Sequence, residues 1–254
     1  MTDATARRDR ARPIPAAPAP QPKIRRTRRA PPPALGRAER STLQDQIYAK
    51  LCTAIMAGTL APGVPVSIRG LAASLGTSPI PVREALRRLA GEQAVEVLPN
   101  GSVAVPRMSR ERFVDLRRTR LVVEGHATEL AAAHITDADI ERLYKLHAEV
   151  MKALTGRDAK RFLARNQRLR FVIYEATRSA TLMPIIRSLW LQVGPLFNWS
   201  FVEPTLAVCV GYDLEAIRAL GRRDGAEARR WIERDIVETG DFILADIARA
   251  AVPG

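Results

Sequence analysis

The sequence predicts a mainly α-helical protein in which one short β-hairpin follows a first group of helices. Apolar residues recur at three- and four-residue intervals through most of the chain after residue 41, which is the spacing of helix faces packed on a core. One strong hairpin signal is present, an Asn-Gly pair between two short apolar runs near residue 100. Aromatic residues make up only 5% of the chain, so we expect cores built from Leu, Ile, Val and Ala.

Length and charge distribution divide the 254 residues into three segments. A chain of this length suits two compact domains, which we place at residues 41–107 and 108–254. Residues 1–40 hold eleven Lys and Arg against three acidic residues, together with eight prolines. Such a segment cannot bury enough surface to offset its ordering entropy, so we expect a disordered basic tail. The tail either adds phosphate affinity without sequence preference or has no role.

Three helices are predicted in the first domain. The first begins at Ser41 and continues with apolar residues at helical spacing until Gly58. The second is short, because Ser67 is a good N-cap and Gly76 a good stop. The third follows after a two-residue gap and begins at Ser78, with a proline at its first helical position.

Two short helices joined by a Gly-containing turn are typical of a helix-turn-helix, and a hairpin directly after them is typical of a wing. The second of the two would be the recognition helix. Its predicted exposed face carries Arg83, Arg87 and Arg88. The residues therefore favour a winged helix-turn-helix that binds double-stranded DNA.

The second domain is predicted to be all-helical, because no further hairpin signal follows Ser109. Short connections imply antiparallel neighbours, so we expect an antiparallel bundle of six or seven helices. The predicted helices cover residues 109–134, 136–155, 158–178, 181–200, 205–220 and 225–250.

Polar residues interrupt three of the apolar faces of this bundle. Arg120 lies on the buried stripe of the first helix, Asn166 and Arg170 share that of the third, and Asp235 lies on the last helix. A guanidinium cannot lie unpaired in a core because its desolvation is too costly. Arg120 and Arg170 are therefore expected either to pair with core acids, such as Glu124 and Asp235, or to line a polar cavity.

Several classes of protein are disfavoured by the sequence. No apolar run approaches the ~18 residues of a membrane span, and the basic N-terminus lacks the apolar region of a signal peptide. Cys52 and Cys209 both lie in apolar runs, where we expect buried free thiols of a reducing compartment. We therefore expect a cytoplasmic protein without membrane contact. Because no Gly-rich phosphate loop or nucleophile motif is present, we do not expect an enzyme.

Residues 43–106 resemble the N-terminal domain of GntR-type bacterial regulators. The resemblance rests on Gly58–Gly63, Leu71-Ala72 and Pro81–Leu89, which contains a Pro-Val-Arg-Glu-Ala-Leu core. It implies that Arg69 and Arg83 contact DNA, that Ser78 lies near a phosphate and that Gly101 forms the tip of the wing. Pro79 stands where many members carry Arg, so one base contact is either missing or supplied elsewhere.

Residues 109–250 resemble the FCD domain, the effector-binding domain of FadR-like GntR regulators. The matching stretches are Leu116–Ala133, Phe171–Ala176, Ser188–Trp190, Glu215–Ile217, Asp224 and Ile236. Many FCD domains hold a divalent metal through one Asp or Asn and three His. Here Asn166 occupies the first ligand position, whereas Arg170, Val210 and Asp235 stand at the three His positions. We therefore predict no metal and no cofactor, and we expect His126, His134 and His147 to be ordinary helix residues.

Two interpretations of Arg170 stay open. Its guanidinium could replace the charge of the metal and bind an acidic effector, with Arg120, Asn166 and Asp235 around it. Alternatively, an Arg170–Asp235 salt bridge fills a vestigial site in a domain that only dimerises. Both can hold if the ligand displaces the bridge.

The function expected from these observations is that of a sequence-specific transcription regulator, acting as a repressor. It would bind a near-palindromic operator as a homodimer and respond to a small effector, an organic acid or a phosphorylated metabolite. The alternative is an architectural DNA binder without sequence preference, whose helical domain only dimerises. An enzyme in the helical domain is the third possibility, and turnover of a bound ligand would reveal it.

Overall fold

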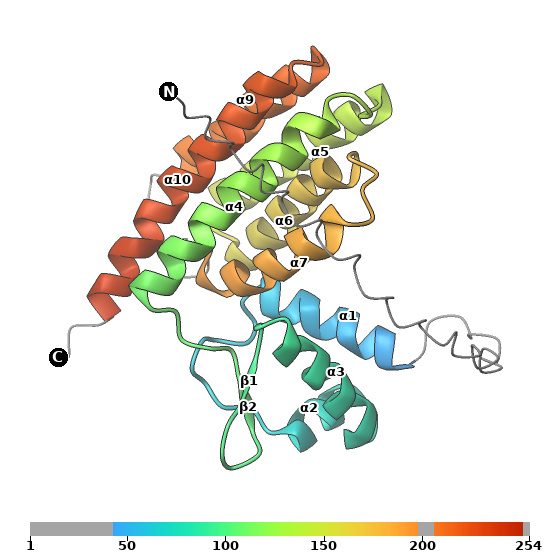
Figure 1. Cartoon of the computed structure of the whole chain (residues 1–254), viewed down its shortest axis with the longest axis vertical. Helices are drawn as coiled ribbons and strands as arrows, with labels where there is room; N and C mark the ends of the chain where they lie inside the picture. Colours follow the sequence, from blue (N-terminus) through green and yellow to red (C-terminus); the bar gives the residue numbers. More distant parts are fainter. Residues whose placement is uncertain (1–42, 198–205, 251–254) are drawn as a thin grey trace, which may run out of the picture. The chain divides into compact units, whose positions relative to one another are not determined.

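The computed structural model describes residues 43–197 and 206–250, and these residues are mainly helical with one two-stranded hairpin (Figure 1). The predicted fold class is therefore confirmed. The predicted basic tail, the cap at Ser41 and the side chain of Cys209 lie outside the described residues. Residues 40–254 belong to one compact unit.

The first three helices form the predicted helix-turn-helix. The Ser67 hydroxyl caps the second helix by accepting a hydrogen bond from the Gly70 N–H at 3.0 Å. The third helix buries its apolar face against the first, and the turn between the second and third helices passes through Gly76 at φ +65°. The helices are α1 (Leu43–Met56), α2 (Ile68–Ser74) and α3 (Pro79–Gly91).

The predicted hairpin follows α3 and consists of β1 (Glu96–Val97) and β2 (Val103–Ala104). The strands are antiparallel, with Glu96 opposite Ala104 and Val97 opposite Val103. Gly101 has a φ of +76° in the connecting loop, a conformation that favours glycine. The segment before α2 also pairs with β2, since the Val66 N–H donates to the Val103 carbonyl at 2.7 Å. This additional pairing was not anticipated from the sequence.

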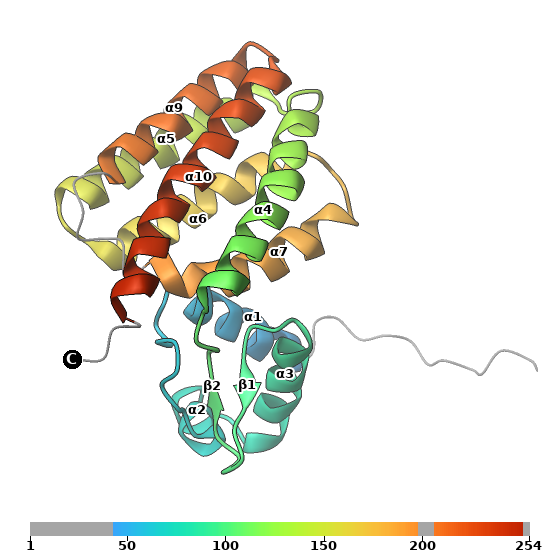
Figure 2. The ribbon, with the colours of Figure 1, turned by 60° about the vertical axis from the view of Figure 1, so that its left-hand side comes forward.

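The rest of the described chain forms a helical bundle (Figure 2). The Thr136–Asp139 capping box at the start of the second bundle helix is present as predicted, and Gly156 ends that helix. The described residues contribute α4 (Arg110–Ala131), α5 (Asp137–Thr155), α6 (Ala159–Glu175), α7 (Leu182–Val193), α9 (Leu206–Gly221) and α10 (Gly225–Ala250).

Helix α10 packs against both α4 and α9, while α5 packs against α6 and α9. A short connection joins α9 to α10, so the two helices run in opposite directions, as Figures 1 and 2 show. The predicted helix over residues 181–200 ends earlier, at Val193, and continues as a 3₁₀ turn (Gly194–Leu196). Pro195 lacks an N–H and disfavours a continuous α-helix at this point. No helix among the described residues is long and apolar enough to cross a membrane.

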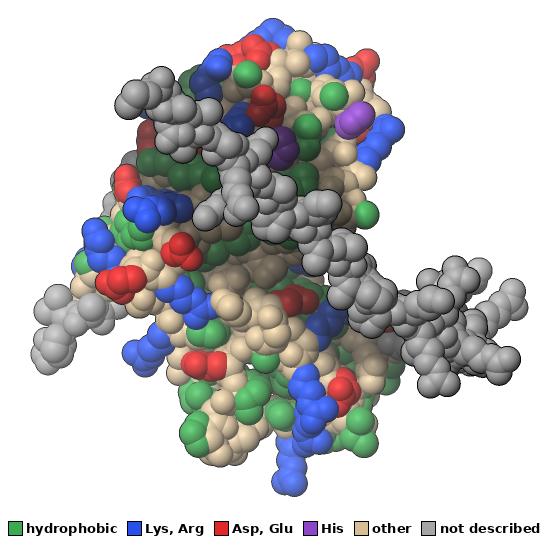
Figure 3. All heavy atoms as spheres, in the orientation of Figure 1, with side chains coloured by type: hydrophobic (Ala, Val, Ile, Leu, Met, Phe, Trp, Pro, Cys, Tyr) green, Lys and Arg blue, Asp and Glu red, His purple; other side chains and the backbone are tan. Residues whose placement is uncertain are grey.

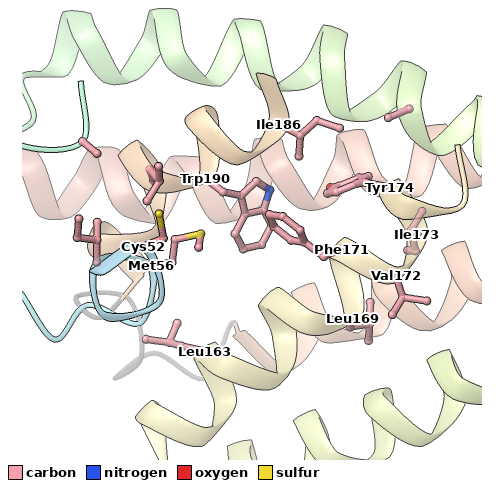
Figure 4. Close-up of a cluster of buried hydrophobic side chains, with 14 of the residues drawn as sticks. Cys52, Met56, Leu163, Leu169, Phe171, Val172, Ile173, Tyr174, Ile186 and Trp190 are labelled. Atoms are coloured by element: carbon pink, nitrogen blue, oxygen red, sulfur yellow. The ribbon is translucent and has the colours of Figure 1, made fainter. Parts of the chain in front are cut away.

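The larger of two apolar clusters continues from α1 into the bundle. Figure 4 shows Cys52 and Met56 of α1 beside Trp190 of α7 and Phe171 of α6. The contact is close at Gly194, where a Cβ atom would lie 2.8 Å from the Met56 Cα. Glycine is therefore needed for α1 to approach the end of α7.

Candidate functional site

The outward face of α3 carries exposed cationic side chains. Arg83 and Arg87 are both exposed, and Figure 3 shows Lys and Arg side chains gathered over α2 and α3. Arg87 is held by Glu84 of the same helix at 2.7 Å. Arg83 forms no ion pair or hydrogen bond with the described part of the chain, so its donors are available to a partner.

Arg88, unlike Arg83 and Arg87, connects two helices of the winged domain. Its guanidinium lies 3.8 Å from the centre of the Tyr48 ring and forms ion pairs with Asp45 at 3.7 Å and Glu92 at 3.5 Å. The Tyr48 hydroxyl donates to Glu92 at 2.6 Å, and burial together with this bond raises the pKa of Tyr48. Arg88 therefore ties α3 to α1.

The remaining predicted DNA contacts surround the start of α3. Ser78 is the N-cap residue, it is exposed, and its hydroxyl makes no capping hydrogen bond. Arg69 on α2 and Gly101 at the end of the hairpin are exposed as well. Sequence reasoning missed Ile80, which follows Pro79 and is 67% exposed at the tip of α3. An apolar side chain there could contact a thymine methyl group.

A small polar cavity lies where α4, α6, α7, α9 and α10 meet. Arg120, Asn166, Arg170 and Asp235 all line it, so the structure brings together the four residues that the sequence analysis grouped. Val210, which the resemblance to FCD domains aligns with a metal-ligand position, lines it as well. Its volume is about 30 Å³, which is room for about one water molecule. A metabolite can therefore enter only by displacing side chains.

Arg170 is the central cation of this cavity and is 2% exposed. Its Nη2 atom lies 2.9 Å from Asp213 Oδ1 on α9 and forms a second ion pair with Asp235 on α10. The Thr239 hydroxyl supports Asp235 by donating to it at 3.2 Å. Arg170 Nη1 is buried without a hydrogen-bond partner among the described residues. The guanidinium therefore keeps one donor available inside the cavity.

The second cation, Arg120, is fully engaged by Glu124. Arg120 donates to both carboxylate oxygens, through Nε at 2.5 Å and Nη2 at 3.2 Å. Glu124 is completely buried and also accepts from the Tyr174 hydroxyl at 2.6 Å and the Trp190 Nε1 at 3.1 Å. Burial, aided by Glu124, raises the pKa of Tyr174, so this hydroxyl stays a donor.

Five ionisable groups thus meet in one buried cluster: two guanidiniums and the three carboxyls of Glu124, Asp213 and Asp235. Burial raises the pKa of Asp213 to about 7, an effect that Arg170 opposes and Asp235 reinforces. Burial also raises the pKa of Asp235. Because both carboxyls are buried and share one cation, protonation of the pair is favoured relative to two exposed carboxyls. The fully ionised cluster would carry a net charge of −1.

The side chains do not fit a divalent metal. The Arg170 guanidinium lies between the two carboxylates that could bind a cation, and Val210 offers no side-chain donor. The remaining side-chain atoms that could bind a metal ion are oxygens, mainly that of Asn166, and they lie beside the positive charge of Arg170. No group of three His, Cys, Asp or Glu with metal-binding geometry occurs in the described ranges. The arrangement is instead one of ion pairs and hydrogen bonds.

Three partners in the cluster were missed by sequence reasoning: Asp213, Tyr174 and Trp190. Asp213 could have been found, because it lies three residues after Val210 and three before Ala216 on the buried face of α9. Tyr174 follows Arg170 by one helical turn, yet an aromatic residue on an apolar stripe carries no signal for a hydrogen bond. The link from Trp190 to Glu124 joins α7 to α4 and could not be predicted from spacing.

None of the three histidines lines the cavity. His126 and His134 are exposed, and His147 Nε2 lies 3.2 Å from the Val210 carbonyl oxygen. Cys52 is a buried free thiol, as predicted, and burial raises its pKa.

Comparison with protein-family models agrees with both the winged helix-turn-helix and the helical bundle. Residues 43–105 match the family model described as bacterial regulatory proteins, gntR family, and residues 115–238 match the FCD domain model. The HTH-type transcriptional regulator McbR of Escherichia coli K12 is 30% identical over 169 residues, which cover 66% of this chain and 76% of that protein.

Further proteins are similar to this chain over most of its length. The "Probable D-xylose utilization operon transcriptional repressor" of Paenarthrobacter nicotinovorans is 28% identical over 84% of this chain and 86% of its own length. The solved structure of E. coli McbR/YncC aligns with a TM-score of 0.77 at 25% identity, covering 82% of this chain and 99% of that one. A GntR regulator from Rhodococcus sp. RHA1 shares the fold with a TM-score of 0.65 at 20% identity, covering 80% of this chain and 97% of that one.

Proposed function

The chain is a transcription regulator of the GntR family with an FCD domain, and on this basis we propose that it is an operator-specific repressor whose DNA affinity is set by a small effector. We further propose that it acts as a homodimer in the cytoplasm. The observation that best supports DNA binding is Arg83, which is exposed on α3 and unpaired within the described residues, while the opposite face of that helix is buried in the core.

The recognition surface has distinct parts. Arg83 points outward from α3 and reads a base edge, while the free Ser78 hydroxyl and Arg69 contact phosphates. Arg87 adds a further phosphate contact once it releases Glu84. Gly101 lets the backbone at the wing tip approach the DNA. Ile80 offers an apolar contact beside Pro79, where many family members carry Arg.

Substitution of Arg83 tests this assignment. The operator is selected from a random duplex library by the protein itself, and binding is followed by fluorescence anisotropy. Arg83→Ala should weaken operator binding by about 1–3 kcal/mol, roughly 5- to 150-fold, with a much smaller effect on random DNA. Arg142→Ala, an exposed arginine of α5, is the matched control. Equal losses on operator and random DNA would assign Arg83 to a phosphate.

The cavity around Arg170 is the proposed effector site, with Arg120, Asn166 and Asp235 as its other polar walls. An organic acid can reach the unpaired Nη1 donor of Arg170 only by displacing a side chain, because the cavity has a volume of only about 30 Å³, and Arg120 is already held by Glu124. Asp235 is the candidate for displacement, because its side chain is 15% exposed whereas that of Asp213 is 3% exposed. The ligand-bound form and the form with the Arg170–Asp235 salt bridge are then two states of one site.

A thermal-melt screen tests the effector site. Organic acids, sugar phosphates, D-xylose and divalent metals are screened against the protein and against Arg170→Lys, which keeps the charge but loses the planar donor set. D-xylose is included because the name of one relative refers to that sugar. An acid that stabilises the parent protein and not the variant would support the proposal. Stabilisation by zinc or nickel alone would contradict the metal-free site, and no stabilisation at all would favour a domain that only dimerises.

A further inference from the structure

We propose that a groove between α1, α6 and α7 is a second ligand site, and that it binds an organic acid with an apolar body. The groove shares no lining residue with the cavity around Arg170. It lies within the single compact unit of residues 40–254.

The groove has the size that the buried cavity lacks. Its volume is about 580 Å³, compared with about 30 Å³ for the cavity around Arg170. Small-molecule sites usually measure about 300–1,000 Å³. A ligand of metabolite size can therefore enter the groove without displacing core side chains.

The base of the groove is apolar. Cys52, Met56 and Phe171 contribute to it, and the three residues are 4%, 8% and 7% exposed. Figure 4 shows that these side chains come from two helices and meet near Trp190. An aromatic or branched aliphatic group lying on this surface would remove apolar area from water.

The rim of the groove is cationic. Arg168 of α6 and Arg187 of α7 are exposed, and neither forms an ion pair or hydrogen bond with the residues that the structure describes. Arg88 is a third cation but already pairs with Asp45. With Asp45 and Glu175 counted as well, the lining carries a net charge of +1, whereas the ionised cluster around Arg170 carries −1. A carboxylate is therefore favoured in the groove, where it can bind a guanidinium without displacing another acid.

A ligand in the groove would contact both halves of the regulator. Helices α1 and α3 belong to the winged domain, and α6 and α7 belong to the helical bundle. Binding would stabilise the arrangement in which the two halves are packed as described. The effect on transcription rests on the proposed function, because it requires that this arrangement differ in operator affinity.

The test uses the full chain and four probes: benzoate, isovalerate, octanoate and indole-3-acetate. Acetate and inorganic phosphate are included as anions without an apolar body, and benzyl alcohol as the body without the charge. Affinity is measured by isothermal titration calorimetry. At least one of the four probes should bind with a Kd below about 1 mM, and the three simpler compounds should bind at least about tenfold more weakly.

Two independent variants address the rim and the volume. Arg168→Gln with Arg187→Gln removes the free cations, and Ala164→Phe fills the groove from an exposed position of α6. Each should weaken probe binding by at least about tenfold. The matched controls are Arg161→Gln and Ala148→Phe, both at exposed positions outside the groove, and they should leave the Kd within about twofold.

The outcomes separate this proposal from the effector cavity. If no probe binds, or if binding persists in both groove variants, the groove is not a ligand site. If binding is lost in Arg170→Lys and kept in the groove variants, the probe occupies the cavity and the groove proposal is wrong, while the proposed function stands. Operator affinity without any probe is measured in parallel, and its absence would refute the proposed function independently of the groove.

Discussion

Replacing Asp213 by Asn should make the protein more stable, and the gain should grow with pH. The change keeps the shape of the side chain and removes one charge from a cluster in which three carboxyls face two guanidiniums. Asp213 is 2% exposed and shares Arg170 with Asp235. A neutral amide at this position relieves the repulsion between the two carboxylates and leaves Arg170 paired with Asp235.

The magnitude follows from the pKa of Asp213, which burial raises from an ordinary 3.8 to about 7. Between these values the folded protein binds the proton more tightly than the unfolded chain, so its stability falls as pH rises and levels off above about 7. At about 1.4 kcal/mol for each tenfold change, the full cost of ionising Asp213 is about 4 kcal/mol, and at pH 5 it is about 2 kcal/mol. Asp213→Asn should therefore be more stable by about these amounts at pH 8 and at pH 5.

The assay is urea unfolding followed by circular dichroism from pH 5 to pH 8, at one fixed protein concentration, so that any contribution of assembly is the same in every sample. Asp137→Asn, whose side chain is 98% exposed, is the control and should change the stability far less. A loss of about 3–5 kcal/mol in Asp213→Asn at pH 8 would refute the reasoning, because it would mean that ionised Asp213 is an indispensable partner of Arg170.

Two further substitutions test the packing around the cluster. Glu124→Gln leaves the buried Arg120 without its counter-charge, so the free energy of unfolding in urea should fall by about 3–5 kcal/mol. The fluorescence emission of Trp190, which donates to Glu124, should shift as well. Unchanged stability would mean that water solvates Arg120 in the variant. Gly194→Ala should cost about 1–3 kcal/mol, because its Cβ would lie 2.8 Å from the Met56 backbone, whereas Gly211→Ala, with open space around it, should be neutral or slightly stabilising. Equal effects of the two alanines in thermal melts would contradict the close approach of α1 to α7.

The fold could be predicted largely because local signals agree along the chain. Ser67, Thr136 and Gly156 mark helix ends through hydrogen bonds that depend only on neighbouring residues, and the structure contains each of them. The pairing of Val66 with Val103 could not be read in the same way. It joins segments far apart in the sequence and leaves no periodic pattern.

The candidate site was predictable only in part. Arg120 and Arg170 were recognisable because an arginine on an apolar stripe needs a partner, and both have one. The expected partners Glu124 and Asp235 are confirmed, but the second partner of Arg170 depends on how α9 is placed beside α6, which spacing within one helix does not encode. Asp213 was therefore missed, and with it the excess of carboxyls that governs the charge of the cavity. The contact of Arg88 with Tyr48 was hidden for the same reason, since Tyr48 lies on another helix.

We propose above all that this regulator recognises a specific DNA sequence, and operator discrimination tests this most directly. Anisotropy titrations at about 150 mM salt compare the selected operator with random duplexes of equal length. The proposed function predicts binding to the operator that is at least about 10³-fold tighter, with the difference reduced in Arg83→Ala. The proposed function would be contradicted if the affinities for the two DNAs agreed within about tenfold and both fell with the same steep dependence on salt. That result would favour an architectural DNA binder.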